Sequence, residues 1–434
     1  MRILKVIPGF PPRFNGDPEV YSRTLVHTLV NIGHEVAVFS RFENLFLPNY
    51  EMYVEQDPLE PRVRLYTINM VRDCDRYRHE KVDTQLSRCL DEFKPDVVHI
   101  GHLNHLSTSI VKVIADKGIP ILFTLHDYWL MCPQGQFIQT GLGEDELWPL
   151  CEGQEDKKCA VKCYSRYFSG LLKHLDEDIS YWTAWVNKRM THIKDMTNLV
   201  DLFVAPSKHL YNRFTKEFGL PTEKIVYLEY GFDHSRLSRR KRRKEAGFVF
   251  GYIGAHVPTK GLHHLIEAFG LLKGKVKLRI YGRTQAPNTV SLQNLATKLS
   301  EGKAEQIEWL SEYQHEEIIP TVFNKIDAII VPSIWDENSS LVIREAQQAK
   351  IPIISADHGS MKEYVAHEVN GLLFQHRNTE DLARQMQQFV DNPSWAEKLG
   401  KRGYLYSDSG EVLSIDEHCK WIIKHYEKVL EAKN

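Results

Sequence analysis

The sequence predicts an α/β protein built from two doubly wound domains, each with a mostly parallel sheet between layers of helices. Short runs of Val, Ile and Leu recur along the 434 residues and alternate with amphipathic stretches. Continuous apolar runs of this kind are typical of strands that are covered on both faces. The pattern restarts near residue 248, and both halves contain the motif Asp-x4-Pro-Ser, beginning at Asp201 and at Asp327. We interpret the motif as a weak internal repeat of two Rossmann-like units.

The first domain is expected over residues 1–235. Its strand-like runs are RILKVI, EVAVFS, VRLYTIN, DVVHI, PILFTLHD, VDLFVAPS and KIVYLEYGF. Residues 19–32 carry apolar side chains at helical spacing and end at Gly33, a residue type that commonly follows a helix. Those apolar positions are Val20, Leu25, Val26, Leu29 and Val30. A strand followed by this helix and a second strand predicts a βαβ opening.

The second domain is expected over residues 248–405, with the strand-like runs FVFGYIG, KVKLRIYG, IEWL, IDAIIVPS, IPIISAD and NGLLF. The segment before it, residues 236–247, is strongly basic. We expect a solvated linker there, and contact with an anionic membrane or nucleic acid is the alternative. Residues 406–434 predict a final helix that packs back and crosses to the first domain. Its expected apolar face carries Trp421, Ile422, Tyr426 and Leu430.

Composition excludes several classes of protein. A hydrophobic content of 42% is ordinary for a globular protein, and a formal charge of −2 argues against a nucleic-acid partner. The first ten residues, MRILKVIPGF, hold too short an apolar run for a signal peptide, and no later run approaches the roughly 18 residues that span a bilayer. We therefore expect a cytoplasmic protein, with peripheral membrane contact left open.

The stretch ENSSLVIRE, residues 337–345, follows a buried strand-like run directly. Asn338, Ser339 and Ser340 are candidate N-caps for the helix after it, so the N–H groups of Ser339, Ser340 and Leu341 should face the crevice at the strand ends. Such a helix end attracts phosphate. On one continuous helix, the eight residues from Glu337 to Glu345 would span roughly 12 Å, which suits two ends of one long ligand. The alternative is two surface glutamates.

Neighbouring loops strengthen this interpretation. Gly254 permits close approach of a ligand to the backbone, and Lys260, beside Gly261, can supply charge to a phosphate, although a lone lysine there is more often a surface residue. The run YGR at residues 281–283 ends the next strand, and Gly359 lies in the run DHGSMKEYV. None of these loops contains GxGxxG, which weakens a dinucleotide dehydrogenase interpretation.

Taken in this order, the motifs resemble the family-4 retaining glycosyltransferases of GT-B fold, also named glycosyl transferases group 1. The matching motifs run from Gly254 to Leu382 and extend to the first half through PPRFNGDPEVYSRTLVHTLVNIGHEV. The resemblance implies two facing Rossmann-like domains, with a nucleotide-sugar donor, UDP-sugar favoured, in the second. A saccharide or lipid-linked acceptor would bind the first domain. It also implies a hexosyltransferase of class EC 2.4 that retains anomeric configuration and requires no metal cofactor.

The resemblance also assigns roles by position. Glu345 matches a glutamate that holds the donor ribose, and Glu337 one that contacts hydroxyls of the transferred sugar. Lys260 matches a phosphate-binding lysine, and Ser339, Ser340 and Leu341 match backbone amides at the sugar and phosphates. Gly16 matches the first glycine of the family's amino-terminal Gly-Gly loop, and Gly254 matches a glycine of the second domain; both are expected to contact the donor. His126, in TLHDYW, matches a histidine near the transferred sugar, although a histidine at a strand end is often structural. The expected catalytic residues are His126, Glu337 and Lys260.

The sequence departs from the family pattern at four positions. The family usually has an arginine where this chain has Ala255, and Arg283 is the best placed replacement, with His256 second. Asp17 and Ser360 stand at positions where the family has a second glycine, and Tyr230 stands where it often has asparagine.

An insertion at residues 128–165 contains four cysteines, Cys132, Cys151, Cys159 and Cys163. Their spacing is compatible with a structural zinc site, and free thiols or disulfides are the alternatives. Nearby, Tyr181, Trp182 and Trp185 are expected to pack in the core rather than to contact lipid or acceptor.

Two other functions remain as alternatives at this point. The first is a nucleotide-sugar epimerase on the same fold. The second is a noncatalytic protein that binds nucleotide-sugars, which Ala255 favours and the retained Glu337, Glu345 and Lys260 disfavour.

Overall fold

The computed structural model describes residues 1–71, 77–140, 148–243, 245–299 and 302–433. It divides into two compact units, Met1–Gly231 with Ile415–Asn434, and Phe232–Ser414. No helix in the described ranges is both long and apolar enough to cross a membrane.

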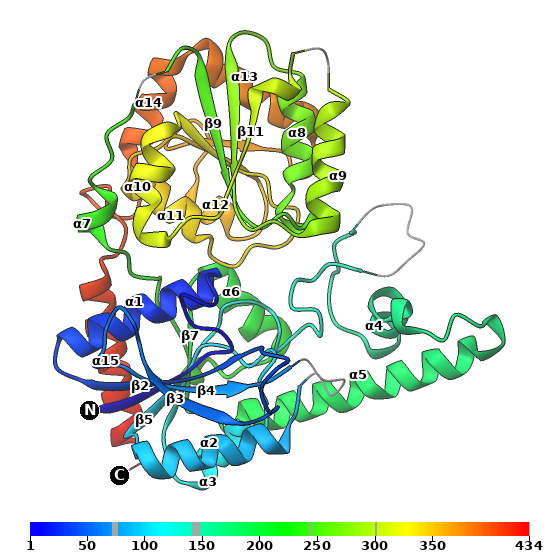
Figure 1. Cartoon of the computed structure of the whole chain (residues 1–434), viewed down its shortest axis with the longest axis vertical. Coiled ribbons are helices and arrows are strands. Elements are labelled where there is room, and N and C mark those ends of the chain that lie inside the picture. The colour runs from blue at the N-terminus through cyan, green and yellow to red at the C-terminus, as the bar shows by residue number, and fades with distance from the viewer. Residues whose placement is uncertain (72–76, 141–147, 244, 300–301, 434) are drawn as a thin grey trace. The chain divides into compact units, whose positions relative to one another are not determined.

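The first unit contains an eight-stranded sheet in the order β3-β4-β2-β1-β5-β6-β7-β8 (Figure 1). All neighbouring strands are parallel except β3 and β4. The strands are β1 Arg2–Val6, β2 Glu35–Phe42, β3 Met52–Gln56, β4 Arg64–Asn69, β5 Val97–Ile100, β6 Ile121–Thr124, β7 Leu202–Ala205 and β8 Ile225–Tyr227. Because β1 lies between β2 and β5, the strand order reverses there, and the carboxyl ends of these strands border a crevice.

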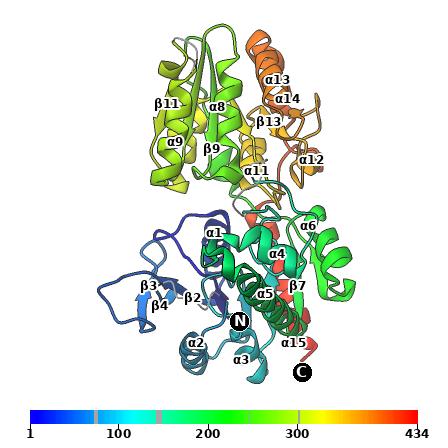
Figure 2. The same cartoon turned by 90° about the vertical axis from the view of Figure 1, so that its right-hand side faces the viewer.

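The helices of the first unit are α1 Asp17–Asn31, α2 Glu80–Phe93, α3 Ile110–Asp116, α4 Asp156–Cys163, α5 Leu175–Asn198, α6 Lys208–Arg213 and α15 Ile415–Glu431. Figures 1 and 2 show α5 extending beyond the edge of this unit's sheet, with α4 beside it. Trp182 stacks on Tyr164 at 4.9 Å between ring centroids, and Trp185 packs on the same ring at 5.2 Å. The two tryptophans therefore pack internally as expected, whereas Tyr181 is exposed.

Helix α15 completes the first unit, although its sequence follows the second. It begins at Ile415 rather than at residue 406, and it packs beside α1. The Tyr426 hydroxyl lies 2.7 Å from His99 Nδ1, and the Tyr21 hydroxyl lies 2.8 Å from His418 Nε2. The expected apolar face is partly wrong, because Trp421 is 49% exposed while Ile422 and Tyr426 are fully buried. The buried stripe runs instead through His418, Cys419, Ile422, Tyr426 and Val429.

The second unit contains a six-stranded, fully parallel sheet in the order β11-β10-β9-β12-β13-β14. The strands are β9 Phe248–Ile253, β10 Val276–Tyr281, β11 Ile307–Leu310, β12 Ala328–Val331, β13 Ile353–Ala356 and β14 Leu372–Phe374. The order reverses between β9 and β12, so the loops that follow these two strands meet at one edge. Residues 254–260 and 332–340 lie in those loops.

The helices of the second unit are α7 His234–Leu237, α8 Leu262–Gly270, α9 Ala286–Thr297, α10 Ile318–Thr321, α11 Leu341–Gln348, α12 Met361–Tyr364, α13 Thr379–Asp391 and α14 Pro393–Arg402. They cover both faces of the sheet, as Figures 1 and 2 show together. Doubly wound packing is therefore present in both units.

Most described residues of the basic segment 236–247 are exposed, as expected, but the segment does not link the two units. It belongs to the second unit, where Arg242 forms two bonds to the carboxylate of Asp327, at 2.6 and 2.8 Å. Arg240 donates to the carbonyl oxygens of Phe323 and Ile326, each at 3.0 Å. Asp327 also accepts from the N–H of Val249, so these arginines tie the segment to the start of the sheet.

We expect Arg242→Ala to destabilise the second unit by about 1.5 to 3 kcal/mol, because it removes charge-assisted bonds to a partly buried carboxylate. Calorimetric unfolding would measure the effect. Arg239→Ala is the matched control, since Arg239 is exposed in the same segment. Equal stability of the two variants would contradict the structural role of Arg242.

Candidate functional site

The loop after β12 contains a buried carboxylate held by two donors. Glu337 is 2% exposed, and its Oε1 accepts from Lys260 Nζ at 2.7 Å and from Ser333 Oγ at 2.7 Å. The Lys260 ammonium also lies 5.4 Å from the centre of the Trp335 ring. A buried carboxylate is costly unless it is paired and hydrogen-bonded, so this ion pair joins the loops after β9 and β12.

A glycine after β13 closes this loop from a third direction. Gly359 has φ +57°, and a Cβ there would lie 2.6 Å from Asp336 Oδ1. The following N–H, of Ser360, donates to the Glu337 carbonyl at 3.0 Å. Ser360 itself has φ −73°, a conformation open to any residue. The departure from glycine at position 360 therefore leaves the backbone of this turn unstrained.

Helix α11 begins directly after this loop, with Ser340 as its N-cap. The Ser339 N–H donates to Asn338 Oδ1 at 2.6 Å, so one of the three amides that we expected to be free is occupied. Within the described part of the chain, no acceptor bonds the N–H groups of Ser340 and Leu341. These two amides add to the positive end of the helix dipole.

Glu345 lies in α11 and belongs to a separate network. It is 3% exposed, and its Oε1 accepts from His315 Nε2 at 2.6 Å and from Arg236 at 3.4 Å. Arg236 also donates to His315 Nδ1 at 2.9 Å. Because an arginine can only donate, Nδ1 must accept, and the His315 proton lies on Nε2 toward Glu345. Burial alone would raise the pKa of Glu345, but His315 and Arg236 outweigh it and lower that pKa.

Neither His315 nor Arg236 was among the residues that the sequence indicated. Arg236 lies in the basic segment, 109 positions from Glu345, and no local motif marks it. His315 follows β11 in the run EYQHEE, which resembles an ordinary polar loop.

The loops after β9 and β10 lie against each other. The N–H of Gly254 donates to the Tyr281 carbonyl at 3.0 Å, and a Cβ on Gly282 would lie 1.9 Å from the Gly254 carbonyl oxygen. The His256 N–H donates to the Arg283 carbonyl at 3.1 Å, so both candidate replacements for the arginine missing at Ala255 lie in this contact.

Arg283 and His256 differ in what they can offer a ligand. The Arg283 side chain is exposed. His256 is 2% exposed, its Nδ1 lies 3.0 Å from Thr289 Oγ1, and burial lowers its pKa. Of the two, only Arg283 presents an accessible positive charge near neutral pH.

His126 follows β6 in the first unit. Its Nδ1 lies 2.5 Å from the Tyr230 hydroxyl, and the two rings are stacked with centroids 5.5 Å apart. Burial lowers the pKa of His126 far below its usual value, so the imidazole is neutral at pH 7. Tyr230, which stands where the family often has asparagine, therefore orients this ring.

Gly16 is the N-cap of α1, and Asp17 is the first residue of that helix. The Gly16 carbonyl accepts from the Val20 N–H at 3.0 Å. A Cβ on Gly16 would lie 2.5 Å from a carboxylate oxygen of Glu19, so the glycine lets that side chain fold over the helix start. Gly16 and His126 thus belong to the first unit, and the other predicted donor-site residues belong to the second.

Two of the four cysteines of the insertion lie on a helix, and the other two lie in loops. Cys159 and Cys163 are one turn apart on α4 and are buried with Tyr164 and Val186. Backbone N–H groups of residues 134–137 face the Cys132 sulfur, and Cys151 is half-buried. None of these four cysteines forms a disulfide. Burial raises the pKa of Cys159 to about 12 and that of Cys163 to about 11. Among the described residues, no three His, Cys, Asp or Glu side chains form an assembled metal-binding group.

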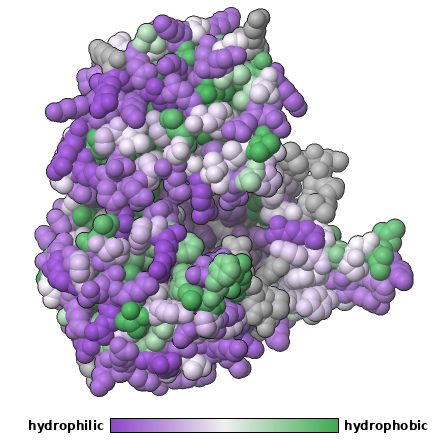
Figure 3. Space-filling model, in the orientation of Figure 1, coloured by the Kyte–Doolittle hydropathy of each residue, from purple (hydrophilic) through white to green (hydrophobic). Residues whose placement is uncertain are grey.

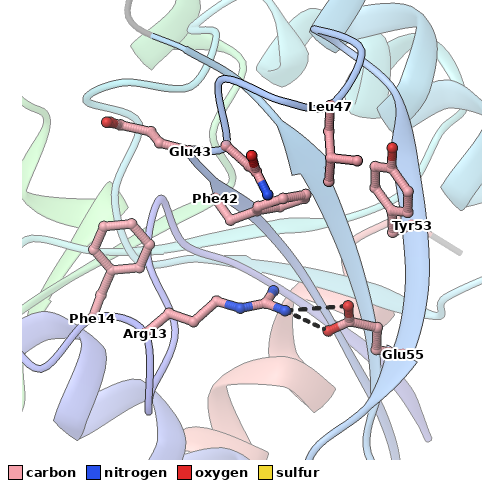
Figure 4. Close-up of a pocket in the computed structure, with 8 residues that line it drawn as sticks. Arg13, Phe14, Phe42, Glu43, Leu47, Tyr53 and Glu55 are labelled. Atoms are coloured by element: carbon pink, nitrogen blue, oxygen red, sulfur yellow. Dashed lines mark hydrogen bonds and ion pairs between the residues drawn. The ribbon is translucent and has the colours of Figure 1, made fainter.

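A cavity of about 600 Å³ lies in the first unit between the loop after β1, the end of β2 and strand β3 (Figure 4). Arg13 and Glu55 line it and bond to each other at 3.1 and 3.2 Å. The guanidinium of Arg13 also lies 5.1 Å from the Phe42 ring centre. Arg13 and Glu55 thus form a partly exposed ion pair in the wall of this cavity.

Comparison with known proteins places these features in a family. Residues 18–236 match the model of Glycosyltransferase Family 4, and residues 233–406 match that of Glycosyl transferases group 1. The chain is 20% identical over 434 residues to the MMP alpha-(1->4)-mannosyltransferase of Mycolicibacterium hassiacum, an alignment that covers 96% of this chain and 95% of that protein.

Two solved structures have the same fold over nearly the whole chain. Sucrose-phosphate synthase from Thermosynechococcus elongatus has a TM-score of 0.71 at 16% identity, covering 99% of both chains. Anabaena Alr3699/HepE in complex with UDP-glucose has a TM-score of 0.63 at 16% identity, covering 98% of this chain and 100% of that one. With two parallel-sheet units of GT-B type and family models that together cover most of its length, the chain belongs to glycosyltransferase family 4.

Proposed function

We propose that this glycosyltransferase transfers a hexose, with retained anomeric configuration, from a nucleoside-diphosphate sugar to a saccharide or lipid-linked acceptor. UDP-sugar is the favoured donor, and the product would belong to polysaccharide or glycoconjugate biosynthesis. The observation that carries the proposal is the buried Glu337, fixed by Lys260 and Ser333 directly ahead of a helix start with two unused amides. The complex of the related HepE fold with UDP-glucose supports the choice of donor.

Each end of the donor has a matching group in the second unit. The diphosphate would bind the N–H groups of Ser340 and Leu341 and the ammonium of Lys260, where the helix dipole also favours negative charge. Glu337 would accept hydroxyls of the transferred sugar. Glu345 would accept hydroxyls of the ribose. The bonds to both carboxylates end on Oε1, so in each case Oε2 is the oxygen proposed for the donor.

The reaction would break the bond between the sugar C1 and the β-phosphate oxygen and form a bond from C1 to the acceptor oxygen on the same face. Negative charge develops on the departing phosphate, and the two amides, Lys260 and Arg283 would stabilise it. The departing phosphate would accept the acceptor's proton, so no side chain is assigned as general base and no metal cofactor is required. His126, neutral and oriented by Tyr230, would hydrogen-bond the sugar during transfer.

Peripheral membrane contact is proposed through the free end of the α4–α5 projection. Leu171, Leu172 and Leu175 are 53%, 89% and 41% exposed there. Figure 3 shows apolar residues gathered at the end of this projection. Exposed leucines on a projecting element suit burial in the headgroup region of a bilayer, where a lipid-linked acceptor would be found.

The donor site is tested by a thermal-shift panel of nucleoside diphosphates and their sugars. We expect UDP and UDP-hexoses to raise Tm, and we expect Lys260→Ala or Glu345→Gln to reduce that shift by more than half. The matched control is Glu312→Gln, which changes an exposed carboxylate on the loop after β11. A panel without any stabilising nucleotide, or an undiminished shift in both site variants, would refute the donor assignment.

Arg283→Ala is expected to lower kcat about 10²-fold while changing UDP affinity little. The reason is that removing one preorganised donor at a developing charge costs about 2.7 to 4 kcal/mol. Steady-state kinetics with a saturating donor would measure it, and Arg283→Lys should recover part of the loss. Turnover within about threefold of the parent would show that another group replaces the missing arginine.

The structural zinc site at Cys132, Cys151, Cys159 and Cys163 stays a proposal. Elemental analysis of protein prepared without chelator should find about one zinc per chain, and Cys159→Ser should lose it and lower Tm. Cys89→Ser, a buried thiol outside the insertion, should keep the metal. Protein that contains no zinc after such a preparation and binds none on addition has free thiols at these positions.

A further inference from the structure

A second cavity in the first unit, of about 380 Å³, opens at the carboxyl ends of its parallel strands. Arg41 lies at the end of β2, Met70 follows β4, His105 follows β5, and Trp129 follows β6. Helix α5 closes the cavity with Arg189. Trp129 lies only three positions after His126. The cavity therefore occupies the edge of a doubly wound sheet at which ligands bind.

Arg189 is a buried cation in this cavity's wall. It is 1% exposed and donates to the Trp129 carbonyl at 2.7 Å, and its guanidinium lies 4.4 Å from the Trp129 ring centre. No carboxylate in the described ranges forms an ion pair with it. The nearby Asp127 bonds instead to His102 at 3.1 Å and to the Trp129 N–H at 2.8 Å. Asp127 therefore attracts the guanidinium without bonding to it. A buried charge without a bonded counterion is costly, and an anionic ligand in the adjoining cavity would reduce that cost.

The rest of the lining has the same sign of charge. Arg41 is 5% exposed and Arg166 lies at an exposed position, whereas no acidic side chain is among the described residues that line the cavity. Arg41 does bond to Glu43, outside the lining, so Arg189 carries the least compensated charge. A concave wall of one sign concentrates ligands of the opposite sign.

Aromatic rings form the other walls. Trp129, Tyr164, Tyr167 and Trp185 line the cavity, and the last of these packs on Tyr164 with ring centroids 5.2 Å apart. Rigid aromatic surfaces with a few charged groups are typical of small-molecule pockets of 300 to 1,000 Å³, roughly the range in which this cavity lies. Pyranose rings present apolar C–H faces that suit such surfaces, and they carry hydroxyls for the polar groups.

We propose that this cavity is the acceptor subsite and that it selects an anionic saccharide, whose phosphate or carboxylate binds Arg189. The aromatic walls hold the sugar ring, and Arg41 provides a second positive charge. This inference rests on the proposed transferase function, because it names the acceptor class for that reaction.

The test uses the full chain and measures binding calorimetrically with glucose 6-phosphate, glucuronate, glucose and inorganic phosphate. Glucose 6-phosphate or glucuronate should bind at least tenfold more tightly than glucose, and the stronger of the two identifies phosphate or carboxylate as the preferred group. Arg189→Met should remove this preference while UDP binding stays unchanged. Lys188→Met, an exposed neighbour on α5, is the matched control and should keep the preference.

Two further variants keep the test decisive if Arg189→Met does not fold. Arg189→Lys should keep part of the preference, and Arg41→Met should reduce it severalfold. Equal binding of glucose and its anionic analogues by the parent chain would overturn the proposal. A preference for anionic sugars that survives in both Arg189→Met and Arg41→Met would also overturn it. The same holds if inorganic phosphate binds as tightly as glucose 6-phosphate. If the parent chain keeps its preference for anionic sugars but does not bind UDP, the donor assignment is refuted and the acceptor proposal is not.

Discussion

The second unit depends on the burial of two carboxylates, that of Glu337 just before α11 and that of Glu345 within it. Glu337 and Glu345 have little contact with water, so each requires a positively charged or donating partner, and those partners come from distant segments. Lys260 precedes Glu337 by 77 positions, and His315 precedes Glu345 by 30. Removing one partner of a buried pair typically costs 3 to 5 kcal/mol, so these ion pairs fix several loops at once. The site is thereby held in place before any ligand arrives.

The two units provide different electrostatic environments. In the second, Glu337 bonds to Lys260, and Glu345 bonds to His315 and Arg236. In the first, burial keeps His99, His126 and His418 neutral by lowering their pKa values, that of His418 to about 4, and tyrosine hydroxyls lie beside their ring nitrogens. The second unit therefore suits a diphosphate. In the first unit, the neutral imidazole of His126 suits an uncharged hydroxyl, whereas the cations Arg41 and Arg189 lie in the cavity that Trp129 lines.

All strands except β3 followed from the sequence because apolar runs are local patterns. Strand β3 was missed because its run, MYVEQ, is partly polar and largely exposed, and it pairs antiparallel with β4. The sequence placed Lys260 and Glu337 near the same ligand, but it did not predict the ion pair between them. Arg236 illustrates what a local pattern omits, since its neighbours in the basic segment gave no sign of a partner 109 positions away. Ser360 illustrates the reverse case, because the loss of a glycine was a concern until its φ of −73° was known. Trp421 was wrongly assigned to the buried face of the last helix, because it lies at the edge of a broad amphipathic stripe and is exposed.

The placement of α15 has a practical consequence for anyone who divides this chain. The backbone passes from the first unit to the second after Gly231 and returns before Ile415. Within the second unit, the Phe232 N–H donates to the Leu413 carbonyl at 2.9 Å, and Phe232 forms a β-bridge with Ser414. The first and last residues of this unit therefore lie next to each other. A fragment ending at Gly231 would lack α15 and would expose the part of α1 that this helix covers. A single chain that contains the complete first unit requires residue 231 to be joined to residue 415 through a short engineered linker.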